Sequence, residues 1–186
     1  MRIIEEGAPH VLFKVVLHGT RDSAVRGSLR AIAEAVTGEA VAPPRDAEIV
    51  THDALDLSLG RVNGVLVDLL LVTAPAEGVH PTARLLVLKQ CDAVLFIADG
   101  RAPEEERARF AELRGHIEAH GYSWAETCVV LQLEELGEGA GAYADALGAA
   151  DRTRVAAHPG HPAGVLDGVK AIARQLLPRA IAQLER

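Results

Sequence analysis

The sequence predicts an α/β fold of the doubly wound type, with a mostly parallel sheet and helices on both faces. Short runs in which nearly every residue is apolar are typical of strands that are covered on both faces. Segments with apolar residues at helical spacing alternate with these runs along the chain. Aromatic residues make up only 3% of the 186 residues, so we expect an aliphatic core of Ala, Val, Leu and Ile.

Five apolar runs predict strands. The dipeptide Asn63-Gly64 favours a hairpin turn in front of the second run, because both residues tolerate positive φ angles. The fifth run is shorter and weaker than the others. The predicted strands cover residues 11–19, 62–73, 93–98, 128–133 and 154–157.

Four segments between or after these runs predict helices. The third opens with Pro103 and three Glu residues, a favourable helix start, and places Phe110, Leu113 and Ile117 on one face. In the fourth, we expect Pro178 to end or kink the helix. Residues 134–148 predict a loop followed by a small helix. The predicted helices cover residues 28–36, 81–88, 103–120 and 162–184.

Composition narrows the function classes. With 49% hydrophobic and 24% charged residues, residues 1–186 are expected to form one globular domain. The net charge of −7 argues against a nucleic-acid surface, because phosphate contacts need clustered Lys and Arg. The two cysteines, Cys91 and Cys128, lie in apolar runs and predict buried thiols in a reducing, cytoplasmic setting. Neither a signal peptide nor a run long enough to span a bilayer is expected.

The loop after the first predicted strand is where a phosphate-binding motif G-x-x-x-x-G-K-[ST] would stand. Its glycines let backbone N–H groups surround phosphates, its Lys balances their charge and its hydroxyl holds Mg²⁺. Counted from Gly19, the second Gly, the Lys and the hydroxyl residue are replaced by Ala24, Val25 and Arg26. The motif is therefore absent apart from its first glycine.

A family resemblance is carried by residues 73–100, TAPAEGVHPTARLLVLKQCDAVLFIADG. This stretch resembles the MglA-type small GTPases of bacterial polarity and gliding motility, in which T-V-P-G-Q precedes a short helix, R-x-L-V-L and D-x-V-x-F-V-A-D. Weaker similarity extends from residue 10 to residue 177 and includes VLQL at 130–133 and the segment 164–177. The matching residues of the main block are Thr73, Pro75, Arg84, Leu86, Val87, Leu88, Asp92, Val94, Phe96, Ala98 and Asp99.

The departures from the family pattern fall on the chemistry. The glycine that senses the γ-phosphate is replaced by Ala76, and the water-orienting Gln by Glu77. The switch threonine has no clear counterpart, since Thr51 is offset from its place. The guanine-reading N-K-x-D falls on acidic residues and a glycine, and the last base-contacting loop begins differently. These nucleotide-reading positions are Glu134, Glu135, Gly137 and Ala157.

The resemblance and its departures together imply a small-GTPase topology without GTP hydrolysis, cofactor or metal. We expect a pseudo-GTPase that serves as an adaptor or regulator in polarity or motility. The alternatives are a divergent GTPase that binds nucleotide weakly, and a constitutive subunit of a motility or secretion complex. The family implies a Roadblock-domain dimer as the protein partner. It would bind over the segment that holds Glu77, Gly78, Val79, His80, Thr82 and Arg84.

Two arrangements of the degenerate phosphate loop follow from the residues. Arg26 and Glu77 replace groups that face each other across the phosphate site, so they are candidates for an internal ion pair; otherwise both point into solvent. The loop from Gly19 to Gly27 is instead expected to collapse if Val25 is buried.

Several other polar residues favour ordinary structural roles. His116 and His120 stand four residues apart on one helix face and are expected to be solvated rather than metal-bound. The run at residues 104–106 is expected to be a helix N-terminus. Asp99 is expected to cap the turn at Gly100 and Arg101, with contact to a ligand as the alternative.

Overall fold

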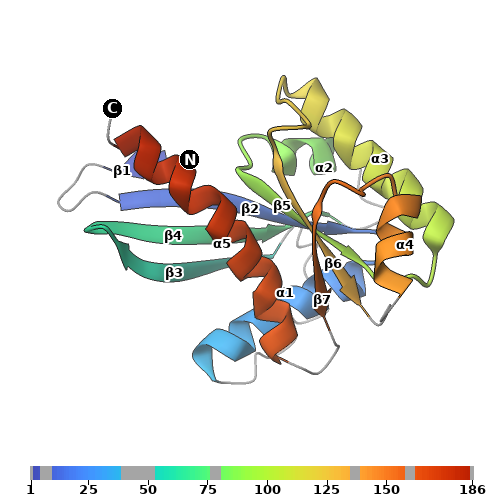
Figure 1. The fold of residues 1–186 in the computed structure, drawn as a ribbon, viewed down its shortest axis with the longest axis horizontal. Helices are drawn as coiled ribbons and strands as arrows, with labels where there is room; N and C mark the ends of the chain where they lie inside the picture. The colour runs from blue at the N-terminus through green and yellow to red at the C-terminus, as the bar shows by residue number, and fades with distance from the viewer. Residues whose placement is uncertain are drawn as a thin grey trace.

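One sheet organises the molecule (Figure 1). The computed structural model describes residues 2–4, 10–38, 53–75, 81–134, 139–157 and 162–184. Within these residues seven strands form a single sheet in the order β3-β4-β2-β5-β6-β7, with β1 paired beside β2. The strands are β1 (Arg2–Ile4), β2 (His10–Gly19), β3 (Ala54–Val62), β4 (Val65–Thr73), β5 (Ala93–Ala98), β6 (Cys128–Glu134) and β7 (Thr153–Ala157).

Most strand pairs are parallel, as predicted. Strand β2 pairs in parallel with both β4 and β5, and β5, β6 and β7 continue the parallel arrangement. The antiparallel pairs are β3 with β4 and β1 with β2. The chain therefore leaves β2 toward one side of the sheet and later returns to its other side, which makes the end of β2 a topological switch point.

Helices cover both faces of the sheet. Helices α1 (Asp22–Thr37) and α5 (Pro162–Leu184) pack on one face, and Figure 1 shows α5 lying across the strands. Helices α2 (Pro81–Leu88), α3 (Pro103–Ala119) and α4 (Ala140–Ala146) pack on the other face. Both cores are mainly aliphatic, as predicted. The mostly parallel sheet with helices on both faces confirms the predicted α/β fold.

The turn at Asn63-Gly64 is confirmed by its backbone. Asn63 has a φ of 50° and Gly64 a φ of 82°, the positive values that a two-residue hairpin turn requires. The predicted strand at residues 62–73 is thus β4 with the last residue of β3 attached. Strand β3 itself was not assigned from the sequence.

Two helix boundaries differ from the predictions. The first helix was expected near Ser28 but begins at Asp22. Pro178 lies inside α5, which continues to Leu184, so of the two expected effects the end of the helix at this proline is wrong, while the kink stays a prediction. None of the helices in the described ranges combines the length and apolar character needed to cross a membrane.

Candidate functional site

The carboxyl end of β2 is the place where a doubly wound fold usually binds its ligand, because the crossovers diverge there. In this chain β2 connects to α1 through Thr20 and Arg21 alone, and the helix begins at Asp22. The backbone N–H groups of Ala24 and Val25 each donate to the Arg21 carbonyl at 3.1 Å. Helical bonds therefore consume N–H groups that a phosphate-binding loop would direct toward its ligand.

Close packing explains the short connection. Val25 is only 3% exposed and joins the core beneath α1. A Cβ added to Gly19 would lie 2.7 Å from the Ile97 carbonyl oxygen and 3.0 Å from Val25 Cγ2. Gly19 thus allows the close approach of β2 to β5. The expected burial of Val25 is confirmed, but it occurs in the first turns of α1 rather than in a collapsed loop.

Arg21 and Asp99 form an ion pair across this junction. The Arg21 guanidinium meets Oδ2 of Asp99, whose side chain is only 5% exposed. The other oxygen, Oδ1, accepts the Arg101 backbone N–H at 3.0 Å, so the predicted capping of the Gly100 turn is confirmed. The arginine holds the start of α1 against the end of β5.

Glu106 extends this network into the core. It is 1% exposed, and its Oε1 accepts the Asp99 N–H at 3.2 Å while Oε2 accepts the hydroxyl of Tyr143 on α4. Burial raises the pKa of Glu106, although the Tyr143 hydrogen bond opposes the shift. Burial and Glu106 also raise the pKa of Tyr143, so this hydroxyl stays a donor. The network ties α3, α4 and β5 together.

Arg26 pairs with carboxylates on both sides of it. Its Nε lies 2.8 Å from Oδ2 of Asp22, one helical turn earlier, and 3.5 Å from Oδ2 of Asp53. The predicted partner Glu77 lies outside the described residues, so that ion pair stays a prediction. Arg26 links α1 to the start of β3.

Hydrogen bonds connect β6 to α1 beside the position that the resemblance implies for a guanine base. Gln132 Nε2 donates to Ser28 Oγ at 2.9 Å, and Ser28 Oγ donates to Glu134 Oε1 at 3.3 Å. Glu134 stands where the resemblance places a guanine-reading amide. Its carboxylate contacts α1 instead of facing an open pocket.

The remaining predicted site residues are either part of the strands and helices or lie outside the described ranges. Thr73 is 1% exposed, and its Oγ1 accepts the Asp53 N–H at 2.7 Å. Ala157 is 3% exposed at the end of β7, and Thr82 is exposed on α2. The predicted site residues outside the described ranges are Ala76, Glu77, Gly78, Val79, His80, Glu135 and Gly137.

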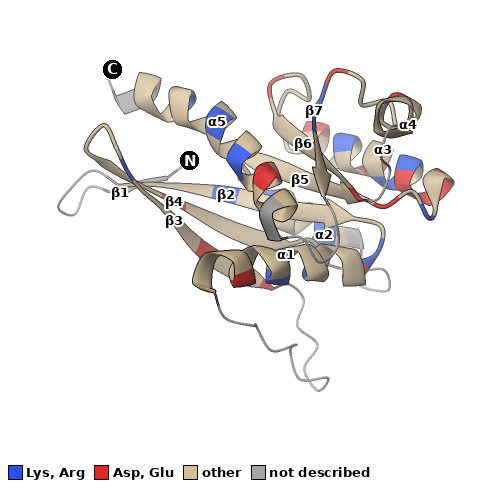
Figure 2. Ribbon diagram, turned by 60° about the horizontal axis from the view of Figure 1, so that its bottom comes forward, with Lys and Arg blue, Asp and Glu red and all other residues tan. Residues whose placement is uncertain are grey.

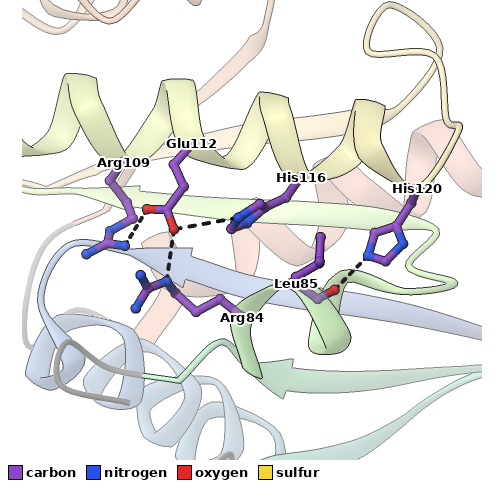
Figure 3. Close-up of polar contacts among 6 residues, drawn as sticks. All are labelled: Arg84, Leu85, Arg109, Glu112, His116 and His120. Carbon is purple, nitrogen blue, oxygen red and sulfur yellow. Dashed lines mark hydrogen bonds and ion pairs between the residues drawn. The ribbon is translucent and has the colours of Figure 1, made fainter. Parts of the chain in front are cut away.

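Helix α2 is held against α3 by a polar cluster around Glu112 (Figure 3). Arg84 Nε lies 3.1 Å from Glu112 Oε1, and Arg109 Nη1 lies 2.5 Å from Oε2. One turn later, His116 Nε2 is 3.7 Å from the same carboxylate. Arg84, a predicted partner contact, is only 9% exposed and directs its guanidinium at α3. It therefore fixes α2 in place.

The two histidines of α3 also face α2 rather than solvent. His120 Nε2 donates to the Leu85 carbonyl at 2.7 Å, and the His116 side chain is 19% exposed. Burial lowers the pKa of His116, although Glu112 opposes this. The expectation that both imidazoles are solvated is wrong, because the helix pair covers them (Figure 3).

His18, the last residue but one of β2, is fully buried under this cluster. It stacks on Phe96 with 5.9 Å between ring centroids, and neither ring nitrogen has a hydrogen-bond partner among the described residues. Burial lowers the pKa of His18 to about 3, and the positive charge of Arg109 acts in the same direction. The imidazole is neutral at physiological pH.

Sequence reasoning missed the buried polar residues of the site. The expected helix start at residues 104–106 is confirmed, but the burial of Glu106 was not foreseen, although it lies one turn before Phe110 on the buried stripe of α3. That spacing was the available signal. Arg21 and His18 carried no comparable signal, because their partners are distant in sequence.

The described residues offer no cluster of three His, Cys, Asp or Glu side chains suited to a metal. Cys128 is 1% exposed and Cys91 is half-buried; burial raises the pKa of each thiol to about 11, so neither is an activated nucleophile. No family model matches the chain, and no curated protein is significantly similar to it.

Replacing Glu112 by Gln should destabilise the contact between α2 and α3. Arg84 and Arg109 would share a neutral amide although their side chains are only 10% and 11% exposed. We expect a loss of about 1–2 kcal/mol in urea unfolding and faster hydrogen exchange in α2. The matched control is Glu118→Gln, which touches exposed Arg114 and should cost under about 0.5 kcal/mol. Equal effects of the two variants would contradict the assigned role.

Burial of neutral His18 should make the protein less stable in acid. The folded pKa lies below the unfolded value of 6.5, so between 6.5 and about 3 the unfolded state binds a proton that the folded state excludes. Stability should therefore fall with pH in this window, by up to about 1.4 kcal/mol per pH unit. His18→Leu should flatten this slope when urea unfolding is measured at about pH 7 and about pH 5. An unchanged slope would show that His18 is protonated in the folded protein.

Proposed function

We propose that this chain is a pseudo-GTPase of MglA-like type, an adaptor or regulator in bacterial polarity or motility that works without hydrolysing GTP. The observation that carries the proposal is the closure of the ligand position at the end of β2. There the N–H groups of Ala24 and Val25 bond to Arg21, and Arg21 pairs with Asp99. The chain's own groups occupy the place where phosphates would be bound.

Charge at this junction also disfavours a nucleotide. A phosphate chain near the start of α1 would approach the carboxylates of Asp22, Asp99 and Asp53, while Arg21 and Arg26 are already paired with these groups. Glu134 adds a negative charge on the base side. Binding would require ion pairs to break and like charges to approach each other, both of which are unfavourable.

The arrangement of the sheet is compatible with the small-GTPase topology that the resemblance implies. Strand β2 lies near the centre, an antiparallel hairpin of β3 and β4 forms one edge, and β5, β6 and β7 follow on the other side. Residues that build this sheet need no nucleotide for their packing. In the proposed function the fold is therefore retained although nucleotide binding is lost.

Helix α2 provides the surface for a protein partner in this proposal. Arg84 and His120 hold α2 on α3, so its outer face has a fixed position without any nucleotide. Thr82 and Leu86 are exposed on it, Leu86 by 60%. A surface that is ordered in one state suits constitutive binding, whereas a GTPase switch needs two states.

The purified protein should bind neither GTP nor GDP. Titration calorimetry with Mg²⁺ present should give no measurable heat, and nucleotide should not co-purify with the native protein. A dissociation constant of about 10 μM or tighter, equivalent to about −7 kcal/mol, would support the divergent GTPase instead. The Arg21→Ala variant should also give no measurable heat, because loss of the ion pair with Asp99 does not create a nucleotide site.

A Roadblock-domain dimer from the native host should bind this chain without nucleotide. Thr82→Arg, on the exposed part of α2, should weaken the co-purified complex at least about tenfold, a change of about 1.4 kcal/mol. The control is Thr153→Arg, which is exposed on the edge strand β7. If the control abolishes binding and Thr82→Arg leaves it intact, the partner surface lies elsewhere.

A further inference from the structure

Three of the four histidines in the described residues gather at the contact between α2 and α3. His18 lies at the end of β2, and His116 and His120 lie at the end of α3. The fourth, His10, lies at the start of β2, where it bonds to Asp68 at 2.7 Å. Histidine is the side chain whose charge changes nearest to neutral pH. Acid can therefore add several positive charges at this one contact.

Both helices present charged groups to His18. Arg84 comes from α2 and Arg109 from α3, and the positive charge of each opposes a proton on the buried imidazole. His116, also from α3, adds a positive charge on this side when it is protonated. Glu112 is the carboxylate of this cluster, and it already accepts hydrogen bonds from both arginines (Figure 3). With His18 and His116 both protonated, four positive charges would face one carboxylate, which is unfavourable.

The strands on either side of His18 add no charge that could balance a proton. Phe96 of β5 stacks on His18 with 5.9 Å between the ring centroids. On the other side of β2, buried Ala74 follows β4 and donates its N–H to the Leu17 carbonyl at 2.8 Å. Charged residues lie instead along α3, as the blue and red bands of Figure 2 show. A positive charge on His18 therefore repels groups on α2 and α3 and is not balanced by the sheet.

Helix α2 is held less firmly than α3. It has eight residues, and of those whose side chains the structure describes, only Arg84 and Leu88 are buried. Helix α3 has 17 residues and buries Phe110, Leu113 and Ile117 as an apolar stripe. Elements with few buried apolar groups open locally before the whole protein unfolds. Repulsion at the cluster should therefore displace α2 and leave α3 on the sheet.

We propose that acid releases α2 from α3, because His18 and His116 take up protons in the open form that the closed contact excludes. Near neutral pH both imidazoles are neutral and the contact is closed. His120 does not act as a sensor, since its Nε2 donates to the Leu85 carbonyl and a protonated imidazole still donates. The release depends only on groups within the chain, so it does not rest on the proposed function.

Acid favours the open form because exposure changes the proton affinity of His18. In the closed contact, burial and the charge of Arg109 hold the pKa of His18 at about 3, and release of α2 lets it return toward 6.5. Between these values only the open form binds the proton, so the open population rises as the pH falls below 6.5. One such proton multiplies the opening equilibrium by up to about 30-fold at about pH 5. Burial also lowers the pKa of His116, although Glu112 opposes this, so His116 acts in the same direction.

Native-state hydrogen exchange of the full chain is the test, with rates corrected for the intrinsic exchange of unfolded peptides. Between about pH 7.5 and about pH 5, the opening equilibrium of the α2 amides should rise at least about tenfold. Low urea should leave this exchange unchanged, because local opening exposes little surface, whereas the β6 amides should exchange more slowly and respond to urea. Exchange of α2 only together with β6, or an opening equilibrium that acid does not change, would overturn the proposal.

His18→Leu should reduce the rise in α2 opening to under about threefold, because the main proton acceptor is removed. The matched control is His10→Gln, which removes a histidine of the same strand outside the contact and should keep the full rise. The wild-type protein provides a measurement that needs no variant. Its His18 ring resonances in NMR should stay those of a neutral imidazole from about pH 7 to about pH 5. An equal rise in His18→Leu and wild type, or a His18 ring that titrates near pH 6.5 while α2 stays protected, would contradict the proposal.

Discussion

The direct connection from β2 to α1 constrains the rest of the site. Gly19 must carry no side chain because β5 lies against it, and Val25 is buried on the same side. With two residues between strand and helix, the first turn of α1 occupies the space above the end of β2. A loop that surrounds phosphates needs several residues with outward N–H groups, and this chain uses those N–H groups in helical bonds. The other polar contacts form around that arrangement.

Ion pairs connect the elements that meet at this junction. Arg21 contacts Asp99, and Glu106 receives the Asp99 N–H and the Tyr143 hydroxyl, so elements from four parts of the chain meet there. Such a network contributes modestly to stability, because the energy needed to bury charges offsets much of their attraction. Its stronger effect is on geometry, since each carboxylate oxygen accepts a defined donor. The junction is thereby held in one arrangement by contacts within the chain.

The sequence predicted the fold well and the site only in part. The apolar runs located β2, β4, β5 and β6, because strands with few exposed residues leave an almost uninterrupted signal. The weaker run at residues 154–157 also located β7, although most of that strand is exposed. Strand β3 was missed although its residues alternate between apolar and polar, since its exposed face weakens a search for continuous runs. The start of α1 was placed six residues late, because the comparison with a phosphate loop assumed a loop where helix had formed.

The polar interior could not be read in the same way. His18 and Glu106 are 0% and 1% exposed, but their residue types favour a surface position, and only the contacts of the folded chain reverse that preference. Glu112 likewise accepts hydrogen bonds from Arg84 on α2 and Arg109 on α3, and no local sequence pattern predicts the contact with Arg84.

These buried polar groups also fix the position of α2. In a nucleotide-driven switch, the helix after β4 moves because phosphate contacts hold it in one state and release it in the other. Here Glu112 and the Leu85 carbonyl hold α2 on α3 through contacts within the chain. The outer face of α2 then keeps a constant shape. A constant shape lowers the entropic cost of binding, so under the proposed function this domain is suited to permanent protein contacts.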